Sequence, residues 1–177
     1  MSLEELYQVA NGGKAEIVNG EVVLMSPTGA APGFAGDEIF VSLRRHVKRM
    51  KVGRAVSDNK GFHVRLPHRE SFSPDAAYYT GPDPGMKFYE GAPVFAAEVR
   101  SEGDYGDSAE AALAAKRADY FQAGTLAVWD VDLLNEAVVR VHRAADPEHP
   151  TVYRRNEVAE AEPAVPGWTM PVDDLFA

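Results

Sequence analysis

The first part of the chain alternates apolar and polar positions with the periods of a helix and of a strand. A capping-box pattern at residues 2–5 predicts a short helix over 2–9. Two β-rich runs then flank Asn19-Gly20 within 15–25, and this dipeptide is the strongest short-range hairpin signal because both residues tolerate positive φ. The pattern therefore predicts an N-terminal β-hairpin.

The rest of the chain continues as short strands around two longer helices. We expect 26–36, which is rich in small residues, to form a loop, and we expect turns to dominate the tail after 143. Apolar residues at helical spacing follow Asp37, namely Ile39, Phe40, Leu43, Val47 and Met50. The pattern also predicts strands over 54–57, 61–66, 75–80, 93–99, 126–131 and 137–143, a loop over 81–93, and a helix over 108–122 that Gly124 closes.

The order of these elements indicates the fold class. A strand over 93–99, a helix over 108–122 and a strand over 126–131 form a strand–helix–strand unit, which predicts a parallel crossover. The other strands read as hairpins, and no repeat or linker divides the chain. We therefore expect one domain over residues 1–177, of α/β or mixed α+β class, with a central mixed sheet flanked by helices.

Composition narrows the function classes. The chain is 45% hydrophobic and 25% charged, as in an ordinary soluble globular protein, and it has no cysteine for disulfides or thiolate metal sites. No apolar run approaches the roughly 18 residues of a membrane span, so we expect a cytoplasmic protein with no membrane partner. The net charge of −9 argues against nonspecific coating of nucleic acid.

One basic stretch stands out against this acidic background. Six of the 18 Lys and Arg residues fall within 44–54, with no acid among them. Such a stretch can face a phosphate backbone, although it can equally be a solvated helix face. The candidate contacts to DNA are Arg44, Arg45, Lys48 and Lys51.

Two carboxylates are candidates for a metal site. If the strands over 75–80 and 93–99 pair antiparallel, Asp75 at the start of one lies beside Glu98 at the end of the other. Two such acids repel each other unless a cation joins them, and Mg²⁺ (or Mn²⁺) prefers oxygen ligands of this kind. The backbone carbonyl of Val99 could supply a further oxygen. The plainer alternatives are that Asp75 is a turn residue and that Glu98 forms a structural salt bridge.

Three further side chains could share this sheet end. Arg100 emerges on the same strand face as Glu98, because side chains alternate along a strand. Lys116 and Tyr120 are four apart and share a helix face. A lysine there could orient or deprotonate an attacking water or stabilise charge on a phosphate, or it could be a solvated helix residue or the salt-bridge partner of Glu98.

The order of these motifs resembles the Uma-type putative restriction endonuclease family of the PD-(D/E)xK nuclease superfamily. The similar segments are S-P-D at 73–75, E-V-R-S at 98–101, the K-x-x-x-Y-x-x-A-G motif at 116–124 with the following L-A-V-W-D-V, and the segments E-I-V-N-G-E-V-V-L-M-S-P and V-P-G-W-T-M near the two ends. The likeness thus covers nearly the whole chain. It implies a restriction-endonuclease-like fold and a Mg²⁺-dependent site that cleaves phosphodiester bonds.

Carried over by position, the resemblance assigns residues to that site. Asp75 and Glu98 match the two acids, and Lys116 matches a helical lysine that resembles a relocated substitute for the superfamily's usual one. Tyr120 matches the aromatic residue that follows this lysine, whereas Glu21 and Ser101 match recurrent positions without an assigned role.

The chain departs from the family pattern at three places. Arg100 stands where the superfamily's lysine falls, and its guanidinium stays protonated, so it cannot be a general base. Pro32 stands about where many members have a histidine, and 101–104 replaces the usual S-P-S-D.

Three functions remain open on the sequence. The first is a Mg²⁺-dependent DNA endonuclease, with a homodimer reasonable for cutting two strands. The second is a catalytically inactive binding or interaction module on the same scaffold, which overall acidity, Arg100 and the missing histidine favour. The third is a small-molecule hydrolase that uses the same carboxylates and would need an enclosed pocket.

Overall fold

A six-stranded sheet of mixed direction forms the centre of the computed structural model, which describes residues 2–8 and 13–177. Strands β8 (Phe95–Val99) and β9 (Ala127–Val131) run parallel because helix α3 (Asp107–Gln122) carries the chain back between them, whereas the other pairs are antiparallel. The predicted crossover and mixed sheet are thereby confirmed. In spatial order the strands are β11 (Asp146–Tyr153), β10 (Val139–Arg143), β9 (Ala127–Val131), β8 (Phe95–Val99), β6 (Ala76–Tyr79) and β3 (Arg54–Ser57).

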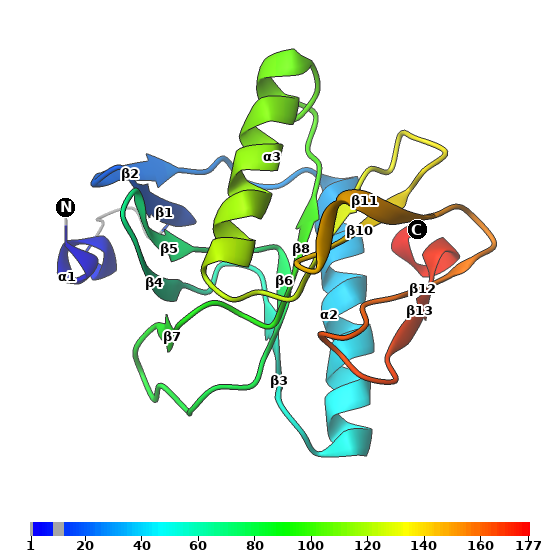
Figure 1. Ribbon diagram of the computed structural model, residues 1–177, viewed down its shortest axis with the longest axis horizontal. Helices are drawn as coiled ribbons and strands as arrows, with labels where there is room; N and C mark the ends of the chain where they lie inside the picture. Colours follow the sequence, from blue (N-terminus) through cyan, green and yellow to red (C-terminus); the bar gives the residue numbers. More distant parts are fainter. Residues whose placement is uncertain (1, 9–12) are drawn as a thin grey trace.

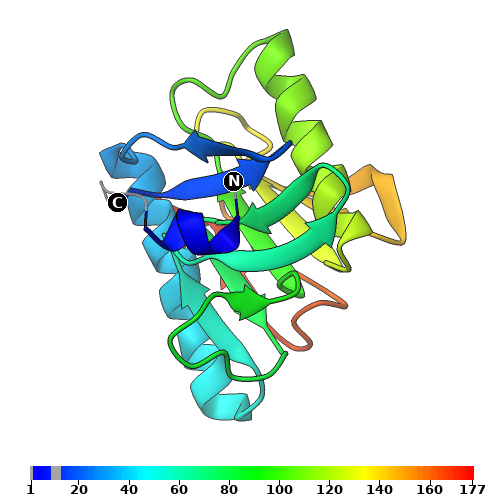
Figure 2. The ribbon, with the colours of Figure 1, turned by 90° about the vertical axis from the view of Figure 1, so that its left-hand side faces the viewer.

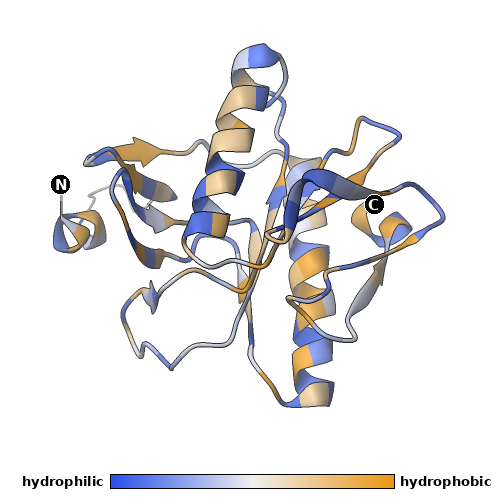
Figure 3. Cartoon of the chain, viewed as in Figure 1, coloured by the Kyte–Doolittle hydropathy of each residue, from blue (hydrophilic) through white to orange (hydrophobic). Residues whose placement is uncertain are grey.

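Two long helices cover opposite faces of this sheet (Figure 1). Along β8, Phe95 and Ala97 belong to the hydrophobic core that includes α2 (Ala30–Met50), whereas Ala96 belongs to the core that includes α3 (Asp107–Gln122). This alternation follows from the two-residue period of a strand. Along α2, hydrophobic and hydrophilic residues are interspersed (Figure 3), and the buried residues recur at helical spacing, as expected for a helix with one buried face.

The C-terminal segment packs on the same face as α2. It contains β12 (Val158–Glu160), β13 (Thr169–Pro171) and the short 3-10 helix η1 (Val172–Leu175). Trp168 stacks on Trp129 of β9 with ring centroids 4.8 Å apart, and its indole N–H donates to the Ser42 hydroxyl at 2.9 Å. A tail that the sequence presents mainly as turns is therefore part of the core.

A second, five-stranded sheet packs on the α3 side of the first, and Figure 2 views the molecule from this side. Asn19 and Gly20 turn the hairpin with φ values of 53° and 75°, which confirms the predicted hairpin. Aromatic residues Phe62 and Phe72 join this sheet to the core around α3. Its spatial order is β2 (Glu21–Leu24), β1 (Ala15–Val18), β5 (Arg69–Phe72), β4 (Phe62–Leu66) and β7 (Tyr89–Glu90), and α1 (Leu3–Tyr7) precedes it in the chain.

The predicted loop over 26–36 is wrong from Ala30 onward, because α2 begins there. Pro32 is tolerated in the first turn, where its missing N–H would have no helical acceptor. Gly36 then packs on Asp75, so that a Cβ added to this glycine would lie 3.7 Å from the Asp75 backbone oxygen. The start of α2 is thereby placed beside the candidate carboxylate.

Two smaller differences concern the first half of the chain. Strand β5 escaped prediction because its pattern is polar, yet Arg69 and Ser71 are buried in it. The capping box of α1 is present, whereas the predicted end of that helix at Val9 lies outside the described residues. None of the described helices combines the length and the apolar character that crossing a membrane requires.

Candidate active site

Asp75 is held at the C-terminal end of β8. Its backbone N–H donates to the Ala97 carbonyl at 3.1 Å, and its Oδ2 accepts the N–H of Val99 at 2.7 Å. The antiparallel register of β6 and β8, with Ala76 opposite Ala97, produces this placement. The expected convergence of Asp75 with the end of the Glu98 strand is therefore present.

Glu98 points from β8 toward α3. Its Oε1 lies 2.9 Å from Lys116 Nζ and accepts the Tyr120 hydroxyl at 2.6 Å. Tyr120 is itself fixed by stacking on Phe72, with ring centroids 4.0 Å apart. The two α3 residues, four apart in sequence, therefore contact the same carboxylate oxygen, as their shared helix face predicts.

The hairpin contributes a third carboxylate that the sequence analysis did not identify. Glu16 of β1 is 3% exposed, and its Oε1 lies 2.9 Å from Lys116 Nζ and accepts the Ser73 N–H at 2.8 Å. Lys116 therefore bridges Glu16 and Glu98. The available signal was an acid between the apolar residues Ala15 and Ile17, but its partners come from distant elements and no local pattern reveals them.

A second lysine, also missed, lies at the other carboxylate. Lys14 Nζ is 2.8 Å from Asp75 Oδ1 and 2.8 Å from Asp58 Oδ1. Lys14 and Glu16 are two residues apart at the start of the hairpin, so both side chains project to the same side. Each candidate metal ligand thus already contacts an ammonium group.

A buried arginine supports the cluster from behind. Arg69 of β5 donates from Nη1 to Glu16 Oε2 at 2.7 Å and from Nε to Asp119 Oδ2 at 2.8 Å. Asp119 of α3 also lies 2.5 Å from His68 Nε2. This chain of ion pairs connects the hairpin sheet to α3 and fixes the orientation of Glu16.

These side chains line one cleft of about 880 Å³. Its walls are the β1–β2 hairpin, the start of α2, the end of β8 with the loop that follows, and one face of α3. Lys14, Glu16, Asp75, Glu98 and Lys116 all border it. The volume falls within the range of ligand-binding clefts.

The electrostatics of the cleft raise the pKa values of Glu98 and of both lysines. Burial raises the pKa of Glu98, and the neighbouring charges of Asp75 and Glu16 raise it further against the opposing effect of Lys116. Burial alone would lower the pKa of Lys116, but Glu16 and Glu98 outweigh it and raise that pKa well above its ordinary value. Asp75 and Glu98 likewise raise the pKa of Lys14 against its burial.

The other residues singled out from the sequence lie elsewhere or act differently. Arg100 turns to Asp130 rather than to Glu98, donating from Nε and Nη2 at 2.8 Å each. Glu21 of β2 is exposed and does not line the cleft, whereas Pro32 and Ser101 do. The basic residues near the end of α2 and at its C-cap are all exposed and lie outside the cleft: Arg44, Arg45, Lys48 and Lys51.

The donor set can accommodate a hard divalent cation. Within residues 2–8 and 13–177, no three acidic or imidazole side chains are grouped as a ready metal site. Asp75 and Glu98 nevertheless repel each other across the cleft, and Mg²⁺ is commonly bound by one or two carboxylates with water completing its shell. These two side chains therefore fit such an ion, with the Val99 carbonyl as a candidate third oxygen.

Comparisons with known proteins agree on one family. A sequence model of the Uma2 family, described as "Putative restriction endonuclease", matches residues 3–173. A solved structure described as a putative nuclease belonging to DUF820 from Anabaena variabilis superposes with a TM-score of 0.73 at 16% identity, covering 99% of this chain and 97% of that one. Among curated proteins nothing matches. The structural likeness shows that the two chains share their fold.

Replacing Lys116 should destabilise the protein in a pH-dependent way. Lys116→Met leaves Glu16 and Glu98 buried without their shared cation, which costs about 3–5 kcal/mol of the free energy of unfolding when a buried pair is broken. The pKa of Glu98 then rises further, so the folded state holds a proton that the unfolded state releases. Stability is lost as the pH rises from the unfolded-state pKa of this carboxyl group toward its raised folded-state pKa. The loss of stability caused by Lys116→Met should therefore grow between about pH 4 and pH 8.

Urea unfolding of both proteins across that range measures the deficit. Lys87→Met removes an exposed lysine and is the matched control, for which we expect a change within about 0.5 kcal/mol. A Lys116→Met deficit that is absent, or constant with pH, would contradict the assigned ion pairs.

Proposed function

Because the chain belongs to the Uma2 putative restriction endonuclease family, we propose that it hydrolyses phosphodiester bonds of DNA with the help of Mg²⁺ or Mn²⁺. The observation that carries the proposal is one cleft in which Asp75, Glu98 and Lys116 meet from three different elements. A homodimer would present two such clefts to the two strands of a duplex.

The chain's own groups divide into cation ligands and a fixed positive charge. Asp75 and Glu98, with the Val99 carbonyl, would hold the divalent ion. When bound, such an ion polarises the scissile phosphate and makes a nearby water more acidic. Lys116 keeps its proton because its pKa is raised, so it donates hydrogen bonds to the water or to the developing phosphate charge and does not act as a base.

Tyr120 and Glu16 position this lysine. The Tyr120 hydroxyl donates to Glu98 Oε1, the oxygen that Lys116 also contacts, and Glu16 Oε1 holds the ammonium from the other side. With two carboxylates as partners, the ammonium has little freedom to move away from the cleft. Orientation of this kind is established before the reaction and lowers the barrier through proximity.

The rival function, a non-cleaving binding module, also has an observation in its favour. Lys14 and Lys116 already neutralise Asp75 and Glu98, so the carboxylates need no metal to be satisfied. A divalent ion must therefore displace or outcompete Lys14 at Asp75. Binding of the ion distinguishes the two functions directly.

Asp75→Asn should abolish divalent-ion-dependent cleavage while keeping the shape of the site. The amide removes one anionic ligand, and we expect the nicking rate on supercoiled plasmid to fall by at least about a hundredfold. Asp83→Asn is the matched control, since Asp83 lies in an exposed loop with Arg54 as its partner at 3.3 Å. Calorimetric titration with Mg²⁺ and Mn²⁺ measures ion binding in the same proteins.

Two outcomes would contradict this assignment. Equal nicking by the wild type, Asp75→Asn and Glu98→Gln would remove both acids from the mechanism. Failure of the wild type to bind either ion at millimolar concentration would favour the non-cleaving module.

Lys116 rather than Arg100 should carry the catalytic positive charge. Lys116→Met should lower kcat by about 10²–10³-fold even at saturating divalent ion, because a fixed charge at the reacting phosphate is removed. Arg100→Lys keeps a cation beside Asp130 and should change kcat little. The measurement is plasmid nicking at a pH where circular dichroism shows that both variants are folded. A larger loss of kcat in the Arg100 variant than in the Lys116 variant would reassign the role to Arg100.

The basic face of α2 is proposed to contact the DNA backbone away from the reacting bond. It begins eight residues beyond Gly36, which places it about 12 Å further along the helix axis from Asp75. Replacing Arg44, Arg45, Lys48 and Lys51 by Gln should weaken DNA binding. The slope of log K against log salt should fall in magnitude by about 0.9 for each phosphate that the variant no longer neutralises.

The matched control removes four exposed cations elsewhere, at Lys60, Arg65, Lys87 and Arg154. We expect this control to leave the salt slope closer to that of the wild type. Fluorescence anisotropy with labelled duplex over a salt series measures both. Equal effects of the two quadruple variants would show that α2 acts only through net charge.

A further inference from the structure

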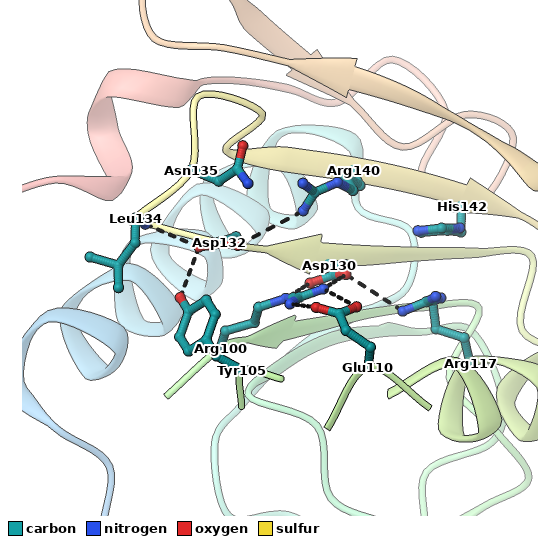
Figure 4. A pocket seen from close by; sticks show the side chains of 10 residues that line it. All are labelled: Arg100, Tyr105, Glu110, Arg117, Asp130, Asp132, Leu134, Asn135, Arg140 and His142. Carbon is teal, nitrogen blue, oxygen red and sulfur yellow. Dashed lines mark hydrogen bonds and ion pairs between the residues drawn. The ribbon is translucent and has the colours of Figure 1, made fainter. Parts of the chain in front are cut away.

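A second cleft, of about 530 Å³, opens at the same end of the six-stranded sheet on the other side of Arg100. It lies between the start of α3 and the strands β9 and β10, and Figure 4 shows its lining side chains. Among the described residues, Arg100 alone borders both clefts. The second cleft is therefore separate from the carboxylates proposed for hydrolysis.

The acids of this cleft are already engaged. Asp130 receives two hydrogen bonds of 2.8 Å from Arg100, and Glu110 pairs with the same guanidinium. Asp132 accepts the Tyr105 hydroxyl at 2.8 Å and the backbone N–H of Leu134 at 3.1 Å. Each described carboxylate of the lining thus accepts at least one hydrogen bond, with Arg100 shared by two of them, and this weakens their repulsion of an anion.

Three basic side chains are left with poor partners or none. Arg117 of α3 reaches Asp130 only at 3.5 Å, and Arg140 of β10 reaches Asp132 only at 4.0 Å. The Nη1 atom of Arg140 and the Nε2 atom of His142 are buried without a hydrogen-bond partner among the described residues. His142 as a whole is 7% exposed and belongs to the lining of the cleft. Unpaired buried polar groups are costly, and a ligand that pairs them removes that cost.

The tautomer of His142 adds a requirement for the ligand. Its Nδ1 lies 3.2 Å from the Pro147 carbonyl oxygen, which can only accept, so Nδ1 carries the proton. Nε2 is then an acceptor in the neutral ring. Residues 140 and 142 share one face of β10, and Figure 4 shows His142 beside Arg117 of α3 and Arg140 directed toward Asp132 in the same cleft.

We propose that this second cleft binds a phosphate monoester group. Its oxygens would accept from Arg117 and Arg140, and in its singly protonated form, present below about pH 6, its P–O–H proton would be donated to His142 Nε2. A phosphodiester has no such proton and satisfies only the two arginines. The chemistry fits the terminal phosphate of a DNA strand or the phosphate of a free nucleotide, and it does not depend on hydrolysis in the first cleft.

Calorimetric titration of the full chain in the presence of a chelator, at about pH 6 so that the monoester keeps part of its proton, tests the proposal. The probes are inorganic phosphate, deoxyadenosine monophosphate and dimethyl phosphate, the last as a diester. We expect one saturable site for the monoester probes and affinity for dimethyl phosphate lower by about tenfold or more. No saturable binding of any monoester probe, or equal affinity for the diester, would overturn the proposal.

Three variants assign the binding to this cleft. Arg117→Gln, Arg140→Gln and His142→Phe should each weaken monoester binding by about tenfold, the loss expected for one charge-assisted or buried hydrogen bond. Arg154→Gln makes the same charge change at an exposed position and should bind as the wild type does. Unchanged binding in all three cleft variants would refute the site.

Two further measurements are needed: one distinguishes lost binding from lost folding, and the other identifies the source of the phosphate. Arg140 Nη1 has no hydrogen-bond partner among the described residues, so Arg140→Gln should leave the melting temperature without phosphate near that of the wild type while reducing its rise with phosphate. An oligonucleotide with a 5′-phosphate that binds more tightly than both free phosphate and its 5′-hydroxyl counterpart identifies a strand end as the ligand. Equal affinity of this oligonucleotide and free phosphate, with the 5′-hydroxyl form not binding, identifies a free phosphate.

Discussion

The ammonium group of Lys116 is the point on which the site depends. It lies 2.9 Å from Glu16 of one sheet and 2.9 Å from Glu98 of the other, and α3 carries it between them. Carboxylates this deeply buried cannot remain charged without a partner. The packing of the hairpin sheet against the six-stranded sheet therefore requires this lysine, and the same requirement places a permanent positive charge beside the cleft.

Ion pairs in the cleft neutralise its buried acids. Asp75, Glu98 and Glu16 each contact at least one of the cations Lys14, Lys116 and Arg69. These pairs compensate the three carboxylates without a metal. They also mean that a divalent ion at Asp75 and Glu98 would free Lys14 from Asp75, and Lys14 would then be available to another anion such as a phosphate oxygen.

Local sequence patterns were sufficient for most of the strands and for the two proposed acids. Antiparallel pairing after a loop brings Asp75 to the end of the strand that carries Glu98, and helical spacing brings Lys116 and Tyr120 to one face. Lys14 and Glu16 were missed because the residues that pair with them at the site, Asp75 and Lys116, lie far away in the chain. The start of α2 was missed because small residues there read as a loop, whereas tertiary packing of Gly36 on Asp75 favours a helix.

Arg100 shows how neighbouring strands can keep two charged clefts apart. In the parallel register of β8 and β9, Glu98 lies opposite Asp130, so two acids stand side by side on one face of the sheet. Lys116 forms an ion pair with Glu98, and Arg100 donates two hydrogen bonds to Asp130. The planar guanidinium of Arg100 is held by Asp130 and Glu110, so it has little freedom to turn toward Glu98. Arg100 therefore separates the two clefts. Arg100 therefore has a structural role beside Asp130, and Lys116 of α3 supplies the positive charge next to Glu98.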